Sequence, residues 1–380
     1  MPEIDDPRGF PDPAAAPAEA RRLHDLAAAS LAAATTQEST ALDATIRQFL
    51  EELLAPGHGA ELADVFATAP AVAIYRHLWR LLAQSELAPV RAGTLNVTVF
   101  ALPVIVVAGI EDGRGAEVTL PCVLADVAAL VNILREHRAL AGNLSFAVAN
   151  VLVGSRAIDL PHLPGLLSRR ALTEAAAHAH VPEPAPIELR GGTETVHLRF
   201  LVGSALAAPG ADLLRDAQVG NWGIPLAQAL ARQLAVPGTS VLALPRAPQS
   251  LVNALRQGRA AQREVGMQLF AANAIRKLRA AVGEPTAVIS AHRAPGAVNG
   301  GELRLSLSSP FDPREAEGFR CPLYPQESVA DVVAMLAGFM AECRVADVRV
   351  VSGVHDDRDS ATGLPLLFKG DRLPETPATH

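Results

Sequence analysis

The sequence predicts an α/β (or α+β) protein in which a mixed sheet follows an N-terminal helical layer. The first reason is a strand–loop–helix–strand pattern that occurs three times, over residues 95–154, 195–246 and 302–355. Each copy opens and closes with a β-branched, apolar stretch of strand length, and a helical stretch lies between the two. The second reason is that residues 20–84 repeat their apolar side chains at three- and four-residue steps, the spacing of amphipathic helices.

The chain opens with residues 1–19, which we expect to be a disordered acidic leader because prolines are frequent there and little can pack. Residues 1–64 hold twelve acids and four arginines, a local balance of −8 (4 − 12), whereas the whole chain carries −7. The rest of the chain is therefore nearly neutral. Residues 20–90 form the predicted helical region, in which Pro56 and Gly57 end one helix and a second begins after Gly59.

The first predicted α/β unit covers residues 95–185 and begins with the apolar stretch LNVTVFALPVIVVAG. This stretch is too short to cross a bilayer of about 30 Å as a helix. We expect a buried strand, bulged at Pro103. A helix over residues 124–140, the strand LSFAVANVLVG and a connector helix over residues 163–180 complete the unit.

The second predicted unit covers residues 186–282, with the strands TVHLRFLVG and TSVLALPR on either side of a short helix over residues 225–234. An Arg-rich helical connector follows, over residues 249–282. Its apolar face changes phase near Gly266, which predicts either a kink there or two separate helices.

The third predicted unit covers residues 283–372 and is followed by a tail, residues 373–380. TAVISAH and ELRLSLSS read as paired strands, and VRVVSGVH as a later strand. The helix between them starts with ADVVAML, which resembles the ADVAAL that starts the helix of the first unit. We therefore predict an internal repeat, in which residues 95–154 superpose on residues 302–355.

Composition and missing motifs restrict the classes of function. The three cysteines, Cys122, Cys321 and Cys343, share no CxxC spacing, which argues for a reducing cytosol. Lysine is almost absent beside arginine, which is typical of a GC-rich bacterial genome. The sequence contains no P-loop, no GxGxxG after a strand, no HExxH and no GxSxG. We therefore expect no cofactor.

A polar cluster near the end of the chain is the one candidate for catalysis. His292 follows the strand TAVIS, and His355, Asp356 and Asp357 follow VRVVSGV. If the two strands are parallel neighbours, both sets emerge at carboxyl ends of strands, where such sheets bind ligands. A histidine with carboxylates is suited to general acid–base or metal chemistry. The alternative, which we favour, is an ordinary hairpin turn, because Asp359 and Gly363 are typical turn residues.

A row of arginines in the connector is the candidate for binding an anion or a partner. Arg256, Arg259 and Arg263 are spaced three and four apart and therefore share one face of a helix. Such a row is suited to phosphates or to an acidic partner, the protein's own leader included. A simple solvated helix face is the favoured interpretation. The negative net charge and the lack of interleaved aromatic residues argue against nucleic acid.

These observations favour a non-catalytic, cytoplasmic protein that binds a protein partner or associates with itself, without contact to a membrane. A hydrolase or metal-dependent enzyme around His292 and His355 is the alternative. A regulatory protein that binds an anion or nucleotide at the arginine row is the third hypothesis. The distance between the two histidines separates the first two hypotheses.

Overall fold

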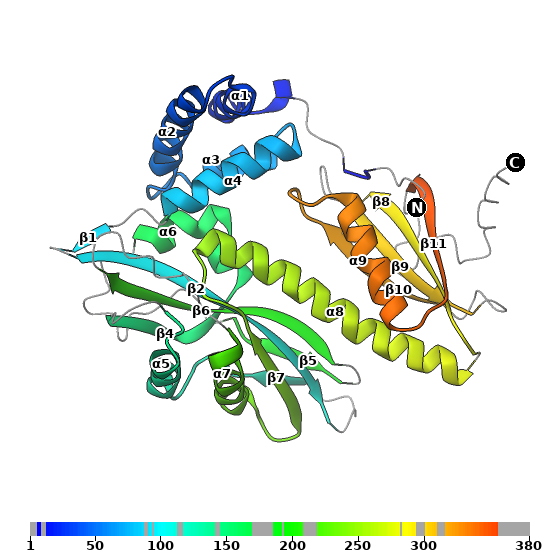
Figure 1. Ribbon diagram of the computed structural model, residues 1–380. Coiled ribbons are helices and arrows are strands. Elements are labelled where there is room, and N and C mark those ends of the chain that lie inside the picture. Colours follow the sequence, from blue (N-terminus) through cyan, green and yellow to red (C-terminus); the bar gives the residue numbers. More distant parts are fainter. Residues whose placement is uncertain are drawn as a thin grey trace, which may run out of the picture. The chain divides into compact units, whose positions relative to one another are not determined.

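The structure is a computed structural model that describes most of the chain. The described residues are 6–8, 13–86, 90–92, 95–111, 117–140, 145–168, 185–191, 194–207, 219–281, 283–293, 301–309 and 316–355. The fold is of the α/β or α+β class, with an N-terminal helical region and a mixed sheet (Figure 1). Among these residues, no helix combines the length and the apolar character that crossing a bilayer requires.

The described residues form two compact units. Unit 1 comprises those of Met1–Ala15, Thr68–Tyr75 and Gly266–His380. Unit 2 comprises those of Ala16–Ala67 and Arg76–Val265. The longer strands of the first and second predicted α/β units enter a single sheet in unit 2, whereas the third predicted unit supplies all four described strands of unit 1.

The helical region of unit 2 consists of α1 (Ala18–Ala32), α2 (Thr36–Leu53), α3 (Gly59–Ala67) and most of α4 (Val72–Glu86). Thr35 starts α2 as a helix cap, because its side chain accepts a hydrogen bond from the backbone N–H of Glu38 at 3.2 Å. The apolar faces of these helices pack together, and the rings of Phe66 and Trp79 meet edge to face with centroids 5.3 Å apart. The short elements η3 (Leu160–His162) and α6 (Leu163–Ser168) lie beside α3, and η2 (Ser155–Ile158) contacts both of them.

The main sheet of unit 2 is antiparallel and is built around the long strand β2 (Leu95–Ile110). One side of β2 pairs with β6 (Thr195–Ala207), which in turn pairs with β4 (Ser145–Gly154). The other side of β2 pairs with β1 (Val90–Ala92) and with β7 (Thr239–Pro245). The register between β2 and β6 runs through Pro103 without a shift, so the predicted bulge at that residue is absent.

Two helices cover one face of this sheet. α5 (Val127–Glu136) and α7 (Val219–Leu234) bury their apolar sides against alternate residues of β2, such as Leu102, Val104 and Val106. A separate two-stranded sheet joins β3 (Glu117–Leu120) and β5 (Ile187–Arg190). Trp222 of α7 is fully buried in the resulting core.

Unit 1 contains a four-stranded mixed sheet with the strand order β10-β9-β8-β11. Its strands are β8 (Thr286–Arg293), β9 (Gly301–Ser308), β10 (Ala316–Leu323) and β11 (Asp347–His355). The predicted pairing of β8 with β9 is confirmed and is antiparallel. α9 (Val329–Glu342) packs on the leucine-rich face of β9, where Leu303, Leu305 and Leu307 are fully buried.

The predicted internal repeat is wrong, because the two segments have different strand arrangements. β2 and β4 both run antiparallel to β6, which lies between them, so β2 and β4 are parallel to each other. β9 is antiparallel to β8, whereas β11 is parallel to β8, so β9 and β11 are antiparallel. The shared ADV motif marks only the start of a helix in both segments.

The arginine-rich connector forms one helix, α8 (Leu251–Ala281), rather than two. The change of phase in its sequence is real, because its two halves bury different faces. Leu251, Leu255 and Gly258 are buried in the first half, whereas Ala271, Ala274 and Leu278 are buried in the second. At 100° per residue these two sets lie on roughly opposite sides of the helix. Residues 251–265 belong to unit 2 and residues 266–281 to unit 1.

Candidate functional sites

The two histidines of the predicted catalytic cluster are neighbours in the structure. β8 and β11 pair in parallel, and His292 and His355 face each other in the register. Their ring centroids are 5.5 Å apart, with the ring planes tilted by 41°. The parallel pairing that the hypothesis required is therefore present. Asp356 and Asp357 lie outside the described residues.

His292 belongs to a polar row on the face of the sheet opposite the leucines. Its Nε2 lies 2.8 Å from the hydroxyl of Ser290, two residues earlier on the same face of β8. Across the strands, His292 is opposite Glu302, and Ser290 is opposite Arg304. Glu302 accepts a hydrogen bond from Nε of Arg304 at 2.7 Å. A buried carboxylate–guanidinium pair therefore continues the row.

The row is buried, which limits its chemistry. Ser290 is fully buried, and His292 and Arg304 are 1% exposed. A serine hydrogen-bonded to a histidine is the pairing from which a hydrolase makes a nucleophile, but a substrate must reach it. Nε2 of His355 is buried and has no hydrogen-bond partner among the described residues. Among all the described residues, no group of three or more His, Cys, Asp or Glu side chains is placed so that it could hold a metal ion.

The arginine row on α8 is half-buried rather than solvated. Arg256, Arg259 and Arg263 flank the face with which the first half of α8 packs against β6. The guanidinium of Arg259 lies 3.2 Å from the carboxylate of Asp159. This arginine is therefore already neutralised, and the row offers less positive charge to an external anion than its sequence indicated.

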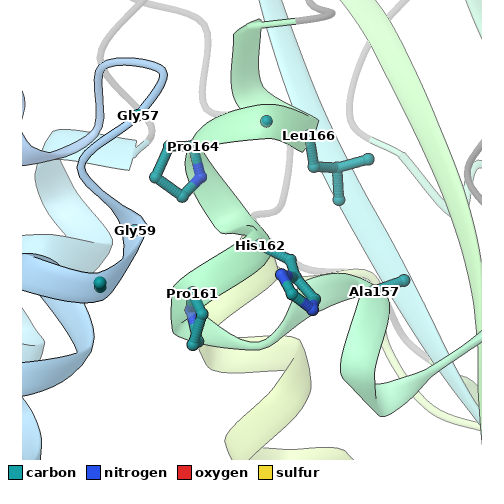
Figure 2. A pocket seen from close by; sticks show the side chains of 9 residues that line it. Gly57, Gly59, Ala157, Pro161, His162, Pro164 and Leu166 are labelled. Atoms are coloured by element: carbon teal, nitrogen blue, oxygen red, sulfur yellow. The ribbon is translucent and has the colours of Figure 1, made fainter.

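A cavity of about 460 Å³ opens between the start of α3 and the segment η3–α6 (Figure 2). Its lining consists mainly of glycine, alanine and proline, with the exposed His162 as its one titratable side chain. Figure 2 shows the His162 ring between Ala157 and Pro161, with Gly57 and Gly59 across the cavity. Acid–base catalysis usually combines two or more polar groups, so the lining is better suited to holding a small apolar group than to chemistry.

A buried polar cluster in the helical region was missed by the sequence analysis. The carboxylate of Asp43 on α2 accepts hydrogen bonds from the hydroxyl of Ser30 on α1 at 2.6 Å and from His77 Nε2 on α4 at 2.8 Å. Arg80 Nη2 donates to it at 2.9 Å. The available signal was that Asp43 lies three residues before the buried Ile46 and seven before the buried Leu50, within the apolar stripe of α2.

The charges around Asp43 keep its carboxyl group ionised. Burial by itself raises the pKa of this carboxyl, but the hydrogen bonds from Ser30, His77 and Arg80 outweigh it, so the pKa lies below its usual value. The cluster ties three helices together through one charge. Because each donor comes from α1 or α4, we assign it to structure rather than to catalysis.

The cysteines have no sign of activation. Cys122 and Cys321 are buried, and Cys343 is half-buried; none of the three forms a disulfide with another described residue. Burial raises the pKa of the Cys122 thiol, and burial together with the neighbouring Glu342 raises the pKa of the Cys343 thiol. A thiol with a raised pKa is a poor nucleophile at neutral pH.

The outer edge of β7 is the other feature with a functional signature. Among the described strands, β7 pairs only with β2. On its other side, the N–H of Thr239 donates to the carbonyl of Val236 at 3.1 Å, and from Ser240 to Pro245 no described residue hydrogen-bonds to the backbone. Its seven residues, TSVLALP, carry no charge, and Leu242 is 53% exposed. An apolar edge of this kind is a template for pairing with another strand.

The chain matches no protein family, no curated protein and no solved structure. Its function is therefore argued from its own residues.

Proposed function

We propose that this protein is a non-catalytic binding module of the bacterial cytosol that associates with a second copy of itself through β7. The observation that carries the proposal is the open, uncharged edge of β7, on which Leu242 is more than half exposed. Free edges usually carry charged residues or are covered, because an open apolar edge invites pairing. The odd number of cysteines, without any CxxC spacing, supports a reducing compartment.

The other edges of the sheets are protected, which makes β7 exceptional among the described strands. β4 is also uncharged, but a neighbouring segment covers its outer side: Leu124 N–H donates to Asn150 O at 2.7 Å, and Leu152 N–H donates to Cys122 O at 2.8 Å. β10 and β11 carry charged side chains, for example Glu317 and Asp347, and the sequence of the three-residue β1 includes Arg91. Charge or cover therefore protects these edges, whereas β7 has neither and carries only Pro245 at its end.

A second copy is the partner that the chemistry of β7 fits. A two-fold antiparallel pairing of β7 with itself, centred on Leu242, places Leu242 opposite its own copy and Ser240 opposite Leu244. No like charges meet in this register, because the strand has none. The pairing joins two sheets into one and buries the exposed leucine.

Native mass spectrometry of gently purified protein tests the proposal. We expect the wild-type chain to appear as a dimer and Leu242→Lys as a monomer, because a lysine on each strand introduces repulsion across the two-fold axis. The dissociation constant of the variant is expected to rise at least about tenfold, corresponding to about 1.4 kcal/mol.

Leu31→Lys is the matched control. Leu31 is a leucine of similar exposure, 50%, on α1 rather than on an open strand edge. It is expected to leave the dimer unchanged. A monomeric wild-type chain, or a dimer that survives Leu242→Lys, contradicts self-association. A different protein that is retained by the wild type and lost from Leu242→Lys assigns the edge to that protein instead.

The alternative candidate is a hydrolase at the histidine pair, favoured by the 5.5 Å separation of His292 and His355 and by the Ser290–His292 hydrogen bond. It requires a motion that opens the fully buried Ser290 to a substrate. Under this hypothesis, hydrolysis of p-nitrophenyl acetate falls at least about a hundredfold in Ser290→Ala, the usual size of a lost catalytic group. Under the binding proposal, we expect equal background rates from Ser290→Ala and the wild type.

The third hypothesis, an anion or nucleotide effector at Arg256, Arg259 and Arg263, draws less support from the geometry. Arg259 already pairs with Asp159 at 3.2 Å. The mass spectra that test the dimer also address this hypothesis, because a retained phosphate or nucleotide adds its mass to the chain.

A further inference from the structure

Arg8, in the acidic leader, is held by the loop that precedes α9. Its Nη1 donates to the carbonyl of Tyr324 at 2.7 Å, and its Nη2 donates to the carbonyl of Glu327 at 3.0 Å. A longer contact of 3.4 Å joins Nη1 to the carbonyl of Pro325. The side chain is 5% exposed, so this arginine is buried among backbone acceptors. All these residues belong to unit 1.

The acceptors are arranged by a turn that closes on itself. The N–H of Glu327 donates to the carbonyl of Tyr324 at 3.0 Å, which defines a turn over residues 324–327. The carboxylate of Glu327 also accepts from the N–H of Tyr324 at 2.9 Å. The turn thereby directs its carbonyls toward one point, where the guanidinium lies.

Asp6 binds the same guanidinium from the side of Nε and Nη2. Nε and Nη2 of Arg8 donate to the two carboxylate oxygens of Asp6 at 2.9 and 2.6 Å, the side-on geometry of a bidentate pair. Burial raises the pKa of the Asp6 carboxyl, but the hydrogen bonds from Arg8 outweigh it, and the pKa lies below its usual value.

The backbone of the same short segment fits closely against β9. A Cβ added to Gly301, the first residue of β9, would lie 2.8 Å from side-chain atoms of both Pro7 and Arg8. The turn therefore meets the guanidinium of Arg8, which also holds the carboxylate of Asp6 two residues earlier, and the start of β9 meets Pro7 and Arg8. The chemistry recognised is an Asp-x-Arg peptide.

We propose that the turn over residues 324–327, with the start of β9, is a binding site for Asp-x-Arg peptides that Arg8 occupies in cis. The contacts from the turn are made by backbone carbonyls, so the site selects the guanidinium of the ligand by shape and hydrogen bonding. Lysine does not fit in its place, because a single ammonium lacks the planar fork that reaches Asp6 and the turn together. The resident segment competes with any incoming peptide of the same kind.

The test uses the full-length Arg8→Ala chain and a fluorescent synthetic peptide with the sequence of residues 1–12, MPEIDDPRGFPD. By fluorescence anisotropy, we expect the peptide to bind Arg8→Ala at least about tenfold more tightly than the wild type, whose own Arg8 competes at an effective concentration on the order of millimolar. Peptides with Arg8→Lys or Asp6→Asn are expected to bind Arg8→Ala about tenfold more weakly than the parent peptide.

A second full-length variant, Arg8→Lys, keeps the test decisive if Arg8→Ala is poorly folded. Arg8→Lys retains the charge and the aliphatic stem while lacking the fork, and it is expected to accept the peptide in the same way. Equal binding of the parent and Arg8→Lys peptides would overturn the proposal, because it would show attraction by charge alone. The absence of binding to both variant chains at millimolar peptide would overturn it as well. Neither outcome depends on the dimer proposed at β7.

Discussion

Gly203→Val is expected to destabilise unit 2 by about 3 kcal/mol, at the upper end of the usual cost of overpacking. Gly203 lies in β6, between β2 and β4. A Cβ at this position would lie 2.4 Å from Cζ of Phe100 and 2.7 Å from the carbonyl oxygen of Ala147. Phe100 is fully buried and Ala147 is on the neighbouring strand, so neither can retreat without disturbing the sheet.

Urea unfolding followed by tryptophan fluorescence measures this loss, because both tryptophans, Trp79 and Trp222, belong to unit 2. Gly220→Ala is the matched control, since no atom lies within 4 Å of its added Cβ and the residue is on α7. This control is expected to raise the free energy of unfolding by up to about 1 kcal/mol through helix propensity. A midpoint for Gly203→Val equal to that of the wild type contradicts the prediction.

The elements were predictable from the sequence because each depends on local spacing. The apolar steps of α1 to α4 and the alternation in β8 and β9 gave the correct types of element and the correct pairing of that hairpin. The repeat failed because strand order is set by contacts between distant segments. β6 inserts between β2 and β4, whereas β8 inserts between β9 and β11, and no local pattern encodes that difference.

In the candidate sites, too, local spacing predicted some features, whereas contacts between distant segments determined the others. His292 and His355 were selected because both follow apolar strands, and the parallel pairing of those strands places them opposite each other. His292 is buried beside the polar face of β9, whose Glu302 and Arg304 alternate with leucines and resemble an exposed strand face in the sequence. The contact of Asp43 with His77 joins residues 34 apart, and that of Arg8 with Tyr324 joins residues 316 apart, so only the folded chain brings them together.

Asp43→Asn is expected to lower the free energy of unfolding of unit 2 by about 2–3 kcal/mol near neutral pH. The carboxylate of Asp43 is 13% exposed and accepts from Ser30, His77 and Arg80, and hydrogen bonds to a charged group contribute about 1.5–3 kcal/mol. The amide of asparagine retains the shape of the side chain, but its NH2 group replaces one carboxylate oxygen. Its N–H groups then face hydrogen-bond donors instead of accepting from them. Asp25→Asn, on the exposed side of α1, is the control and is expected to change little.

The effect of Asp43→Asn should disappear in acid, and the sign follows from the lowered pKa of Asp43 in the folded chain. A carboxyl whose pKa is lower folded than unfolded stabilises the protein fully above its unfolded pKa of about 3.9, and this stabilisation is lost as the pH falls through the folded pKa. The difference between the wild type and Asp43→Asn, measured by urea unfolding at a series of pH values, should therefore be constant near neutrality and shrink below about pH 4. A difference that persists unchanged in acid would mean that the hydrogen-bonding pattern of the side chain at this position, rather than its charge, holds the three helices together.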